Sequence, residues 1–171
     1  GSIDEPLSDA SFIPTFLLSR FTKQNITVAL GGDGADELFA GYPTFQAESF
    51  VHFYEKLPQG LRRTLESILL KSVTASDGYL SARFKLKQFL KGVGAERGIR
   101  HQLWLSSFTR NMRSELLSEN ILSKIIGANE YEDAIRYWNE VNTDDRSKTL
   151  YQYMRTYLMD EVLVKLDRAS M

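Results

Sequence analysis

The chain is predicted to be a mostly α-helical piece of an α/β architecture, with one clear buried strand at about residues 26–30. Apolar residues recur at helical spacing along most of the sequence, which favours helices. The run ITVAL at 26–30 is instead continuously apolar and partly β-branched, as is typical of a strand buried on both faces. A glycine-rich loop follows this run directly. Helix, strand, glycine loop and new helix together indicate part of an α/β domain.

Apolar periodicity also locates the expected helices. Pro14 is expected to open or bend the first of them, and Pro58 suits the first turn of the next. Most of the periodic apolar side chains are expected to form a core, and residues 72–81 have the composition of a loop. The predicted helices cover residues 8–23, 61–69, 84–93, 131–138 and 150–158.

Composition limits the possible partners and compartments. With 21 Lys and Arg against 22 Asp and Glu, the net charge of −1 offers a polyanion no general attraction, so nucleic acid is not an expected partner. The absence of cysteine excludes disulfides and thiolate chemistry, and it fits a reducing compartment. The apolar runs are much shorter than a membrane span. We expect a cytoplasmic protein with small-molecule substrates and no membrane partner; homo-oligomerisation stays open.

The glycine loop after the predicted strand carries the chemistry. Gly31, Gly32 and Gly34 let the backbone turn tightly and approach a ligand, and amides at the next helix start favour phosphate. Asp33 and Asp36 would repel a bare phosphate, but a magnesium ion held by one or two carboxylates bridges to phosphates. The loop is therefore interpreted as a Mg-nucleotide site. The alternative is that Asp33 caps the following helix in a turn without a ligand, and spacing alone does not decide between them.

Three stretches of the sequence resemble one family. Residues 28–42, VALGGDGADELFAGY, are similar to the segment of class B, glutamine-hydrolysing asparagine synthases that reads SG[ED]G[SAG]DE followed by [LVI]F[AG]GY. Residues 4–20 and 160–171 resemble family segments before and after it, whereas the region from Gln46 to about Lys148 matches only in helical character. Residues 1–42 would form part of the nucleotide-binding α/β portion of the C-terminal synthetase domain, and residues 43–171 its helical portion.

The resemblance implies an ATP-pyrophosphatase fold of the adenine-nucleotide α-hydrolase-like kind and a ligase of asparagine biosynthesis. In that family a carboxylate, aspartate in the standard members, attacks the α-phosphate of ATP to give an acyl-adenylate and pyrophosphate. Ammonia from glutamine, released in a separate amidotransferase domain, then displaces AMP. ATP and Mg²⁺ are the implied cofactors.

The family motif also assigns roles within the loop. Asp36 corresponds to the aspartate that helps hold magnesium and pyrophosphate, and Asp33 to the carboxylate of the amide-forming step. Gly32 and Gly34 match glycines of the motif. Gly31 stands where the family often has serine, so one hydroxyl that would contact phosphate is missing.

Lys165, Asp167 and Arg168 match the family's K-x-D-R pattern and are expected to shape the pocket for the second substrate. Their alternative role is a solvated helix face with local ion pairs of little energy.

Four other residues are expected to be structural. Glu37 should support the start of the helix or contact the site from behind, and Tyr42 should pack. His52 and His101 have no neighbouring ligand pattern.

Two alternatives to an asparagine synthase remain at this stage. One is a related adenylating amide ligase, of the β-lactam-synthetase-like or peptide-cyclising kind, in which the substrate's own amine attacks. The other is a non-catalytic helical interaction module that keeps the loop as a turn.

The chain alone is predicted to bind almost no ATP and to be inactive. Gly1 and Ser2 resemble what tag removal leaves, so a fragment is expected, and the family's S-G-G-x-D-S pyrophosphate loop does not occur in residues 1–171. The resemblance places that loop upstream. Calorimetry with Mg-ATP should detect no binding, and micromolar affinity would contradict the prediction.

Overall fold

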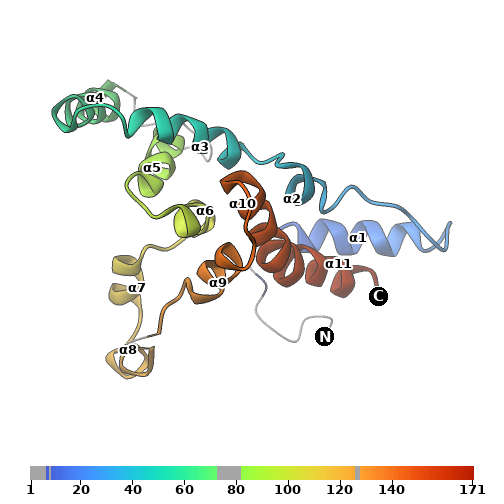
Figure 1. Cartoon of the computed structure of the whole chain (residues 1–171). Helices are drawn as coiled ribbons and strands as arrows, with labels where there is room; N and C mark the ends of the chain where they lie inside the picture. Colours follow the sequence, from blue (N-terminus) through green and yellow to red (C-terminus); the bar gives the residue numbers. More distant parts are fainter. Residues whose placement is uncertain (1–6, 8, 73–81, 126–127) are drawn as a thin grey trace. The chain divides into compact units, whose positions relative to one another are not determined.

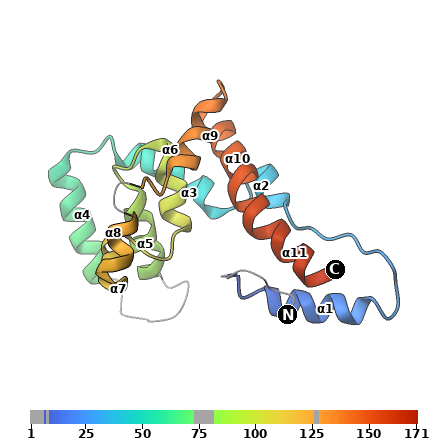
Figure 2. The ribbon, with the colours of Figure 1, turned by 90° about the horizontal axis from the view of Figure 1, so that it is seen from below.

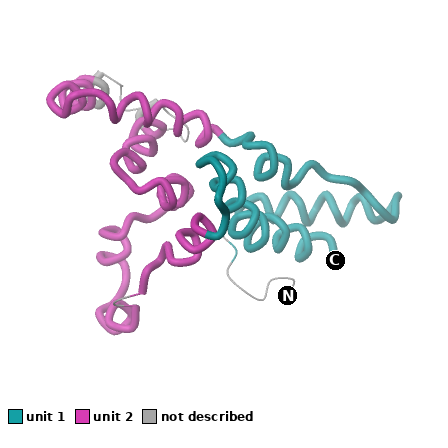
Figure 3. The backbone as a smooth tube through the Cα atoms, viewed as in Figure 1, with its two compact units in different colours: residues 1–42, 140–171 teal, residues 43–139 magenta. Residues whose placement is uncertain are grey.

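The computed structural model describes residues 7, 9–72, 82–125 and 128–171. The chain divides into two compact units, shown in different colours in Figure 3. One unit consists of residues 1–42 and 140–171, and the other of residues 43–139. Within the described ranges the regular structure is helical throughout.

The predicted strand at residues 26–30 is not present, so that part of the fold prediction was wrong. The segment runs between two helices without regular structure, and Ile26, Val28 and Leu30 are 51%, 76% and 99% exposed. An apolar, β-branched run becomes a strand only where a second strand accepts and donates its backbone hydrogen bonds. The described residues contain no such partner segment.

In the first unit helix α1 lies beside helix α11, as Figures 1 and 2 both show. Helix α1 packs along α11, and the short helix α2 packs on α10 and on the π-helical segment η1. The segments α10, η1 and α11 follow one another without a break, and π-helical turns of this kind are frequent at functional sites. The bounds are α1 Phe12–Thr22, α2 Ala35–Phe39, α10 Asp145–Tyr153, η1 Met154–Val162 and α11 Leu163–Ser170.

The core of this unit lies around α10 and η1. Tyr153 is fully buried, Val162 is 6% exposed, and the ring of Tyr42 stacks on that of Tyr153 with centroids 5.5 Å apart. Helix α1 formed where periodicity predicted it, but much of its apolar stripe faces outward, with Leu17 57% and Phe21 65% exposed. Periodicity thus located the helix without indicating how much of its apolar stripe is buried.

The second unit contains the remaining helices except for Glu140, the last residue of α9, and within it α5 packs on α6 and α3 on α5. Helices were expected after Pro58 and at 84–93 and 131–138, and α4, α5 and α9 occupy those places. Residues 73–81 of the predicted loop lie outside the described residues, and Ser72 ends α4. The bounds are α3 Pro43–Tyr54, α4 Gln59–Ser72, α5 Ala82–Gly92, α6 Arg97–Leu105, α7 Arg110–Leu116, α8 Glu119–Ile125 and α9 Glu132–Glu140.

A buried arginine joins three segments of the second unit. Arg100, 3% exposed, donates to Glu48 at 2.8 Å and to Glu55 at 2.9 Å, and its Nε donates to the carbonyl of Gly92 at 3.0 Å. Because its donors meet carboxylates and a carbonyl, the charge is compensated inside the unit. Burial alone would raise the pKa of Glu48, but the His101 and Arg100 side chains outweigh it and hold that pKa below its ordinary value.

His101, which was expected to be structural, is buried in the second unit. It is 2% exposed, and its ring lies 5.0 Å from those of Phe45 and Trp104. His52, in contrast, is exposed on α3.

None of the described helices combines the length and apolarity that a bilayer crossing requires.

Arg100→Ala should lower the free energy of unfolding by about 3 kcal/mol, because it leaves two partly buried carboxylates without their cation. The control is Arg110→Ala, whose side chain is 73% exposed and 3.6 Å from Glu130, and which should cost less than about 1 kcal/mol. Urea unfolding followed by circular dichroism measures both. Equal losses for the two variants would contradict a central role for Arg100.

Candidate functional site

The glycine loop leads directly into helix α2. Gly34 stands at the N-cap with φ 89°, and the Leu38 N–H donates to its carbonyl at 3.1 Å. No side chain caps the helix, so Asp33 does not fill the capping role that the sequence left open. The Asp33 carboxylate is therefore available for other contacts.

Two glycines of this region are required by geometry. Gly34 adopts a left-handed conformation that side chains rarely take, and a Cβ there would lie 3.3 Å from Leu158 Cδ1. Gly41 follows Ala40, which ends α2 in a left-handed conformation, and its N–H donates to the Asp36 carbonyl at 3.1 Å. A Cβ on Gly41 would lie 2.0 Å from Asp36 Oδ1, so the missing side chain leaves room for that carboxylate. Sequence reasoning placed Gly41 in the motif but missed this role.

The loop, α2, η1 and α11 line an open cavity of about 270 Å³. Asp33 and Asp36 reach it from exposed positions, and Lys165 enters from α11. The structure thus brings the predicted residues Gly32, Asp33, Gly34, Asp36 and Lys165 to one place. Its lining residues are Gly32, Asp33, Gly34, Asp36, Glu37, Tyr42, Tyr157, Val162 and Lys165.

Lys165 is the only cation that lines this cavity among the described residues, and its side chain is 10% exposed. Its Nζ lies 3.0 Å from Asp9 Oδ2, 3.0 Å from Ser11 Oγ and 3.8 Å from Asp33 Oδ1. Burial would lower the pKa of Lys165, but the hydrogen bond and charge of Asp9, followed by the charge of Asp33, outweigh it and raise that pKa. The lysine is therefore charged at neutral pH. Sequence reasoning missed Asp9 and Ser11, because 154 residues separate Ser11 from Lys165.

The cavity lining also includes a buried carboxylate. Glu37 is 2% exposed and accepts a hydrogen bond from the Tyr42 hydroxyl. Burial and then the Glu37 carboxylate raise the pKa of Tyr42 well above its ordinary value, so the phenol stays protonated. Burial and the Asp9 and Glu161 charges raise the pKa of Tyr157 as well. Tyr42 packs against Tyr153 and Tyr157, as expected. Glu37, which was expected to contact the site from behind, is instead one of the residues that line the cavity.

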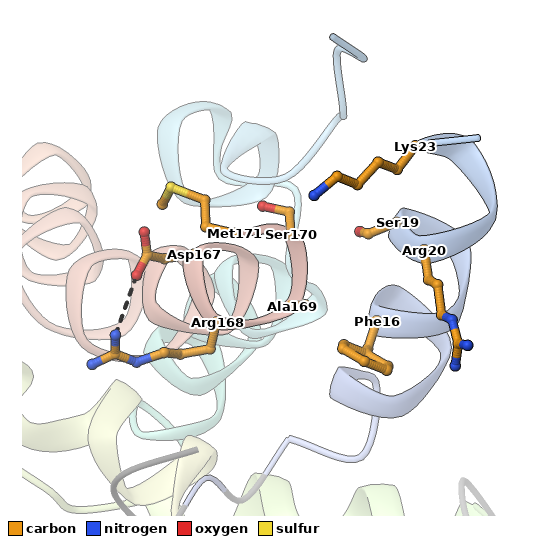
Figure 4. A pocket seen from close by; sticks show the side chains of 9 residues that line it. All are labelled: Phe16, Ser19, Arg20, Lys23, Asp167, Arg168, Ala169, Ser170 and Met171. Carbon is orange, nitrogen blue, oxygen red and sulfur yellow. Dashed lines mark ion pairs between the residues drawn. The ribbon is translucent and has the colours of Figure 1, made fainter. Parts of the chain in front are cut away.

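Asp167 and Arg168 lie at a different cavity, of about 400 Å³, between α1 and α11 (Figure 4). Asp167 Oδ2 is 3.5 Å from Arg168 Nη1, and Arg20 and Lys23 of α1 line the same cavity. Asp167 lies two positions after Lys165 and therefore points to a different side of α11. Arg168 lies three positions after Lys165, on a neighbouring part of the helix surface, and lines the other cavity from about one turn further along α11.

The acidic loop fits a magnesium ion that arrives with phosphates rather than one held by protein alone. Among the described residues no group of three or more His, Asp or Glu side chains gathers as a metal cage. Magnesium is commonly bound through one or two carboxylates plus substrate phosphates, and the exposed Asp36 carboxylate meets that requirement. At Gly31, a Cβ would lie 3.2 Å from Asp33 Oδ2, so the absence of a side chain there avoids a tight contact beside Asp33.

Comparison with known proteins identifies the family to which this site belongs. The family model described as asparagine synthase matches residues 1–171. The chain therefore belongs to the asparagine synthase family, and this membership confirms the resemblance seen in its motifs. The family implies an α/β fold, of which the described residues contain only helices and loops.

Three curated relatives illustrate the similarity. Asparagine synthetase [glutamine-hydrolyzing] 1 of Bacillus subtilis is 26% identical over 98% of this chain and 25% of its own length. Putative asparagine synthetase [glutamine-hydrolyzing] 2 of Methanocaldococcus jannaschii is 28% identical over 98% of the chain and 30% of its own length. A putative asparagine synthetase [glutamine-hydrolyzing] of Mycobacterium tuberculosis is 35% identical over 39% of the chain and 10% of its own length. No solved structure matches.

Gly34→Ala should destabilise the first unit by about 1–2 kcal/mol, because alanine is strained at a left-handed φ. The matched control is Gly32→Ala in the same loop, where no atom lies within 4 Å of an added Cβ and φ is not left-handed. Urea unfolding should show the loss for Gly34→Ala alone. Equal stabilities of the two variants would contradict the described loop conformation.

Proposed function

We propose that the chain is part of the synthetase region of an ATP-dependent ligase that converts a substrate carboxylate into an amide. Family membership supports the ligase, and one observation supports the location of the site: the Asp33 and Asp36 loop and Lys165 line a single cavity. Because the chain spans only 25% and 30% of two relatives that it matches along nearly its whole length, the activity is proposed for the longer protein that contains it.

The first proposed step forms an acyl-adenylate. A carboxylate oxygen of the substrate attacks the α-phosphorus of ATP, the bond from that phosphorus to the bridging oxygen breaks, and pyrophosphate leaves. Asp36 is proposed to hold magnesium, which neutralises charge on the phosphate oxygens when bound. Gly31, Gly32 and Gly34 are proposed to let phosphate oxygens come close to the loop, and of these Gly31 and Gly32 are exposed whereas Gly34 is buried.

The second proposed step forms the amide. The nitrogen of ammonia attacks the acyl carbon, the bond to the AMP oxygen breaks, and the nitrogen loses one proton. The Asp33 carboxylate lines the cavity and is not used in capping α2, so we assign it to orient ammonia or accept that proton. Ammonia is proposed to come from glutamine, as the names of the relatives suggest.

The remaining assignments also rest on the similarity to the asparagine synthase family. Residues 1–42 are proposed as part of the nucleotide-binding portion, and residues 43–171 as the helical portion of the same domain. Aspartate is the first acceptor carboxylate to test. Lys165 is proposed to face the substrates at the acidic loop, and Asp167 with Arg168 to act from the separate cavity.

The experiment uses the full-length protein, with pyrophosphate release and amide formation measured separately. Asp36→Asn should reduce both by about a hundredfold or more, because the proposed magnesium ligand serves the first step. Asp33→Asn should reduce amide formation by about a hundredfold or more while pyrophosphate release persists. The control, Asp160→Asn, changes an exposed carboxylate of η1 and should leave both rates unchanged.

Wild-type turnover by Asp36→Asn would refute the proposal. Pyrophosphate release that depends on a carboxylate bearing its own amine, without glutamine or ammonia, would instead indicate the related class of adenylating ligases. A full-length protein that never releases pyrophosphate would favour the interaction module.

A further inference from the structure

Lys165 does not form a direct hydrogen bond to the carboxylate that it faces across the cavity. An ammonium has three N–H donors, and two acceptors, Asp9 Oδ2 and Ser11 Oγ, lie at 3.0 Å from Nζ. Asp33 Oδ1 lies at 3.8 Å, which is ion-pair distance but too long for a hydrogen bond. The carboxylates of Asp9 and Asp33 therefore share one cation, and the Asp9 carboxylate lies closer to it.

The Asp9 side chain is itself held in a defined position. Its Oδ1 accepts a hydrogen bond from the Ser11 N–H at 2.8 Å, and its carbonyl accepts from the Phe12 N–H at 3.1 Å at the start of α1. Burial alone would raise the pKa of Asp9, but hydrogen bonds from Ser11 and Lys165 outweigh it and keep that pKa below the ordinary value. The turn before α1 thus presents a charged carboxylate and a hydroxyl to the same ammonium.

We propose that Asp9 and Ser11 are positioning residues for the amide-forming step: they anchor Lys165 so that its charge stabilises the Asp33 carboxylate without occupying the oxygens of that carboxylate. This inference rests on the role proposed above for Asp33. Both oxygens of Asp33 then remain able to accept hydrogen bonds from ammonia and to take up the proton lost when nitrogen attacks the acyl carbon and AMP leaves.

The contacts that hold Lys165 matter because the Asp9 and Asp33 carboxylates compete for its ammonium group. Without the Asp9 charge, Lys165 is expected to move the short distance to Asp33 and donate a hydrogen bond to its carboxylate. The Asp33 carboxylate is then less able to accept a hydrogen bond from ammonia. Tyr157 on η1 also raises the pKa of Lys165. The charges of Glu161 on η1 and Glu37 on α2 in turn raise the pKa of Tyr157. All three remain unchanged in the variants proposed below.

The test uses the full-length protein and three variants. Asp9→Asn removes the competing charge, Ser11→Ala removes only the hydroxyl contact, and Ser11→Thr keeps a hydroxyl as the conservative control. Amide formation should fall about tenfold to a hundredfold in Asp9→Asn, and less in Ser11→Ala, while pyrophosphate release stays within about twofold of wild type. Ser11→Thr should retain both partial reactions.

A second measurement tests the contacts of Lys165 with Asp9 and Ser11 independently of activity. Acetic anhydride acetylates accessible amines, and mass spectrometry of the Lys165 peptide reports the rate, with the exposed Lys23 as internal reference. Acetylation of Lys165 should rise several-fold in Asp9→Asn and Ser11→Ala and stay at the wild-type rate in Ser11→Thr.

An equal fall of both partial reactions would overturn the inference, since that result indicates a purely structural role. Unchanged amide formation together with unchanged Lys165 acetylation would also overturn it. Failure of the proposed function is recognised separately, because a wild-type protein without carboxylate-dependent pyrophosphate release fails before any of these variants is compared.

Discussion

The candidate site depends on one ammonium that three segments share. Lys165 Nζ contacts Asp9 and Ser11 ahead of α1 and faces Asp33 in the glycine loop, so a single side chain of α11 links the loop to the packing of α1. A buried cation is costly unless carboxylates and hydrogen bonds compensate it, and here they do. The same cation offsets the repulsion between two acidic segments. The lysine therefore serves both the packing of this unit and the electrostatics of its cavity.

The rest of the site follows from the way in which the loop is shaped. Gly34 turns the chain into α2 with a left-handed φ, and Gly41 leaves space for the Asp36 carboxylate at the other end of that helix. The π-helical segment η1 supplies Tyr157 to the cavity and Leu158 against Gly34. The Tyr42 hydroxyl donates a hydrogen bond to the buried Glu37 carboxylate, and both side chains line the cavity. The exposed carboxylates of Asp33 and Asp36 thus share the cavity with the rings of Tyr42 and Tyr157.

Sequence reasoning succeeded where local patterns are sufficient. Periodicity located helices that the structure contains, and the motif at residues 28–42 led to the family that the whole-chain match confirms. The buried strand at 26–30 was wrong because a strand needs a partner, which no local pattern contains. The K-x-D-R residues looked like one group in the sequence, yet only Lys165 reaches the acidic cavity. Side-chain direction on the helix separates Asp167 from Lys165, and position along the helix separates Arg168 from it.

The sequence by itself determined the residue types of the loop, the helical character of the chain and its family, because these depend on composition, spacing and motif. Only the tertiary structure decided that Asp9 and Ser11 meet Lys165 across 154 residues, that Asp167 and Arg168 face another cavity, and that Glu37 is buried. Long-range pairing of charges is set by how helices pack, and packing depends on the whole chain at once rather than on any single window of sequence.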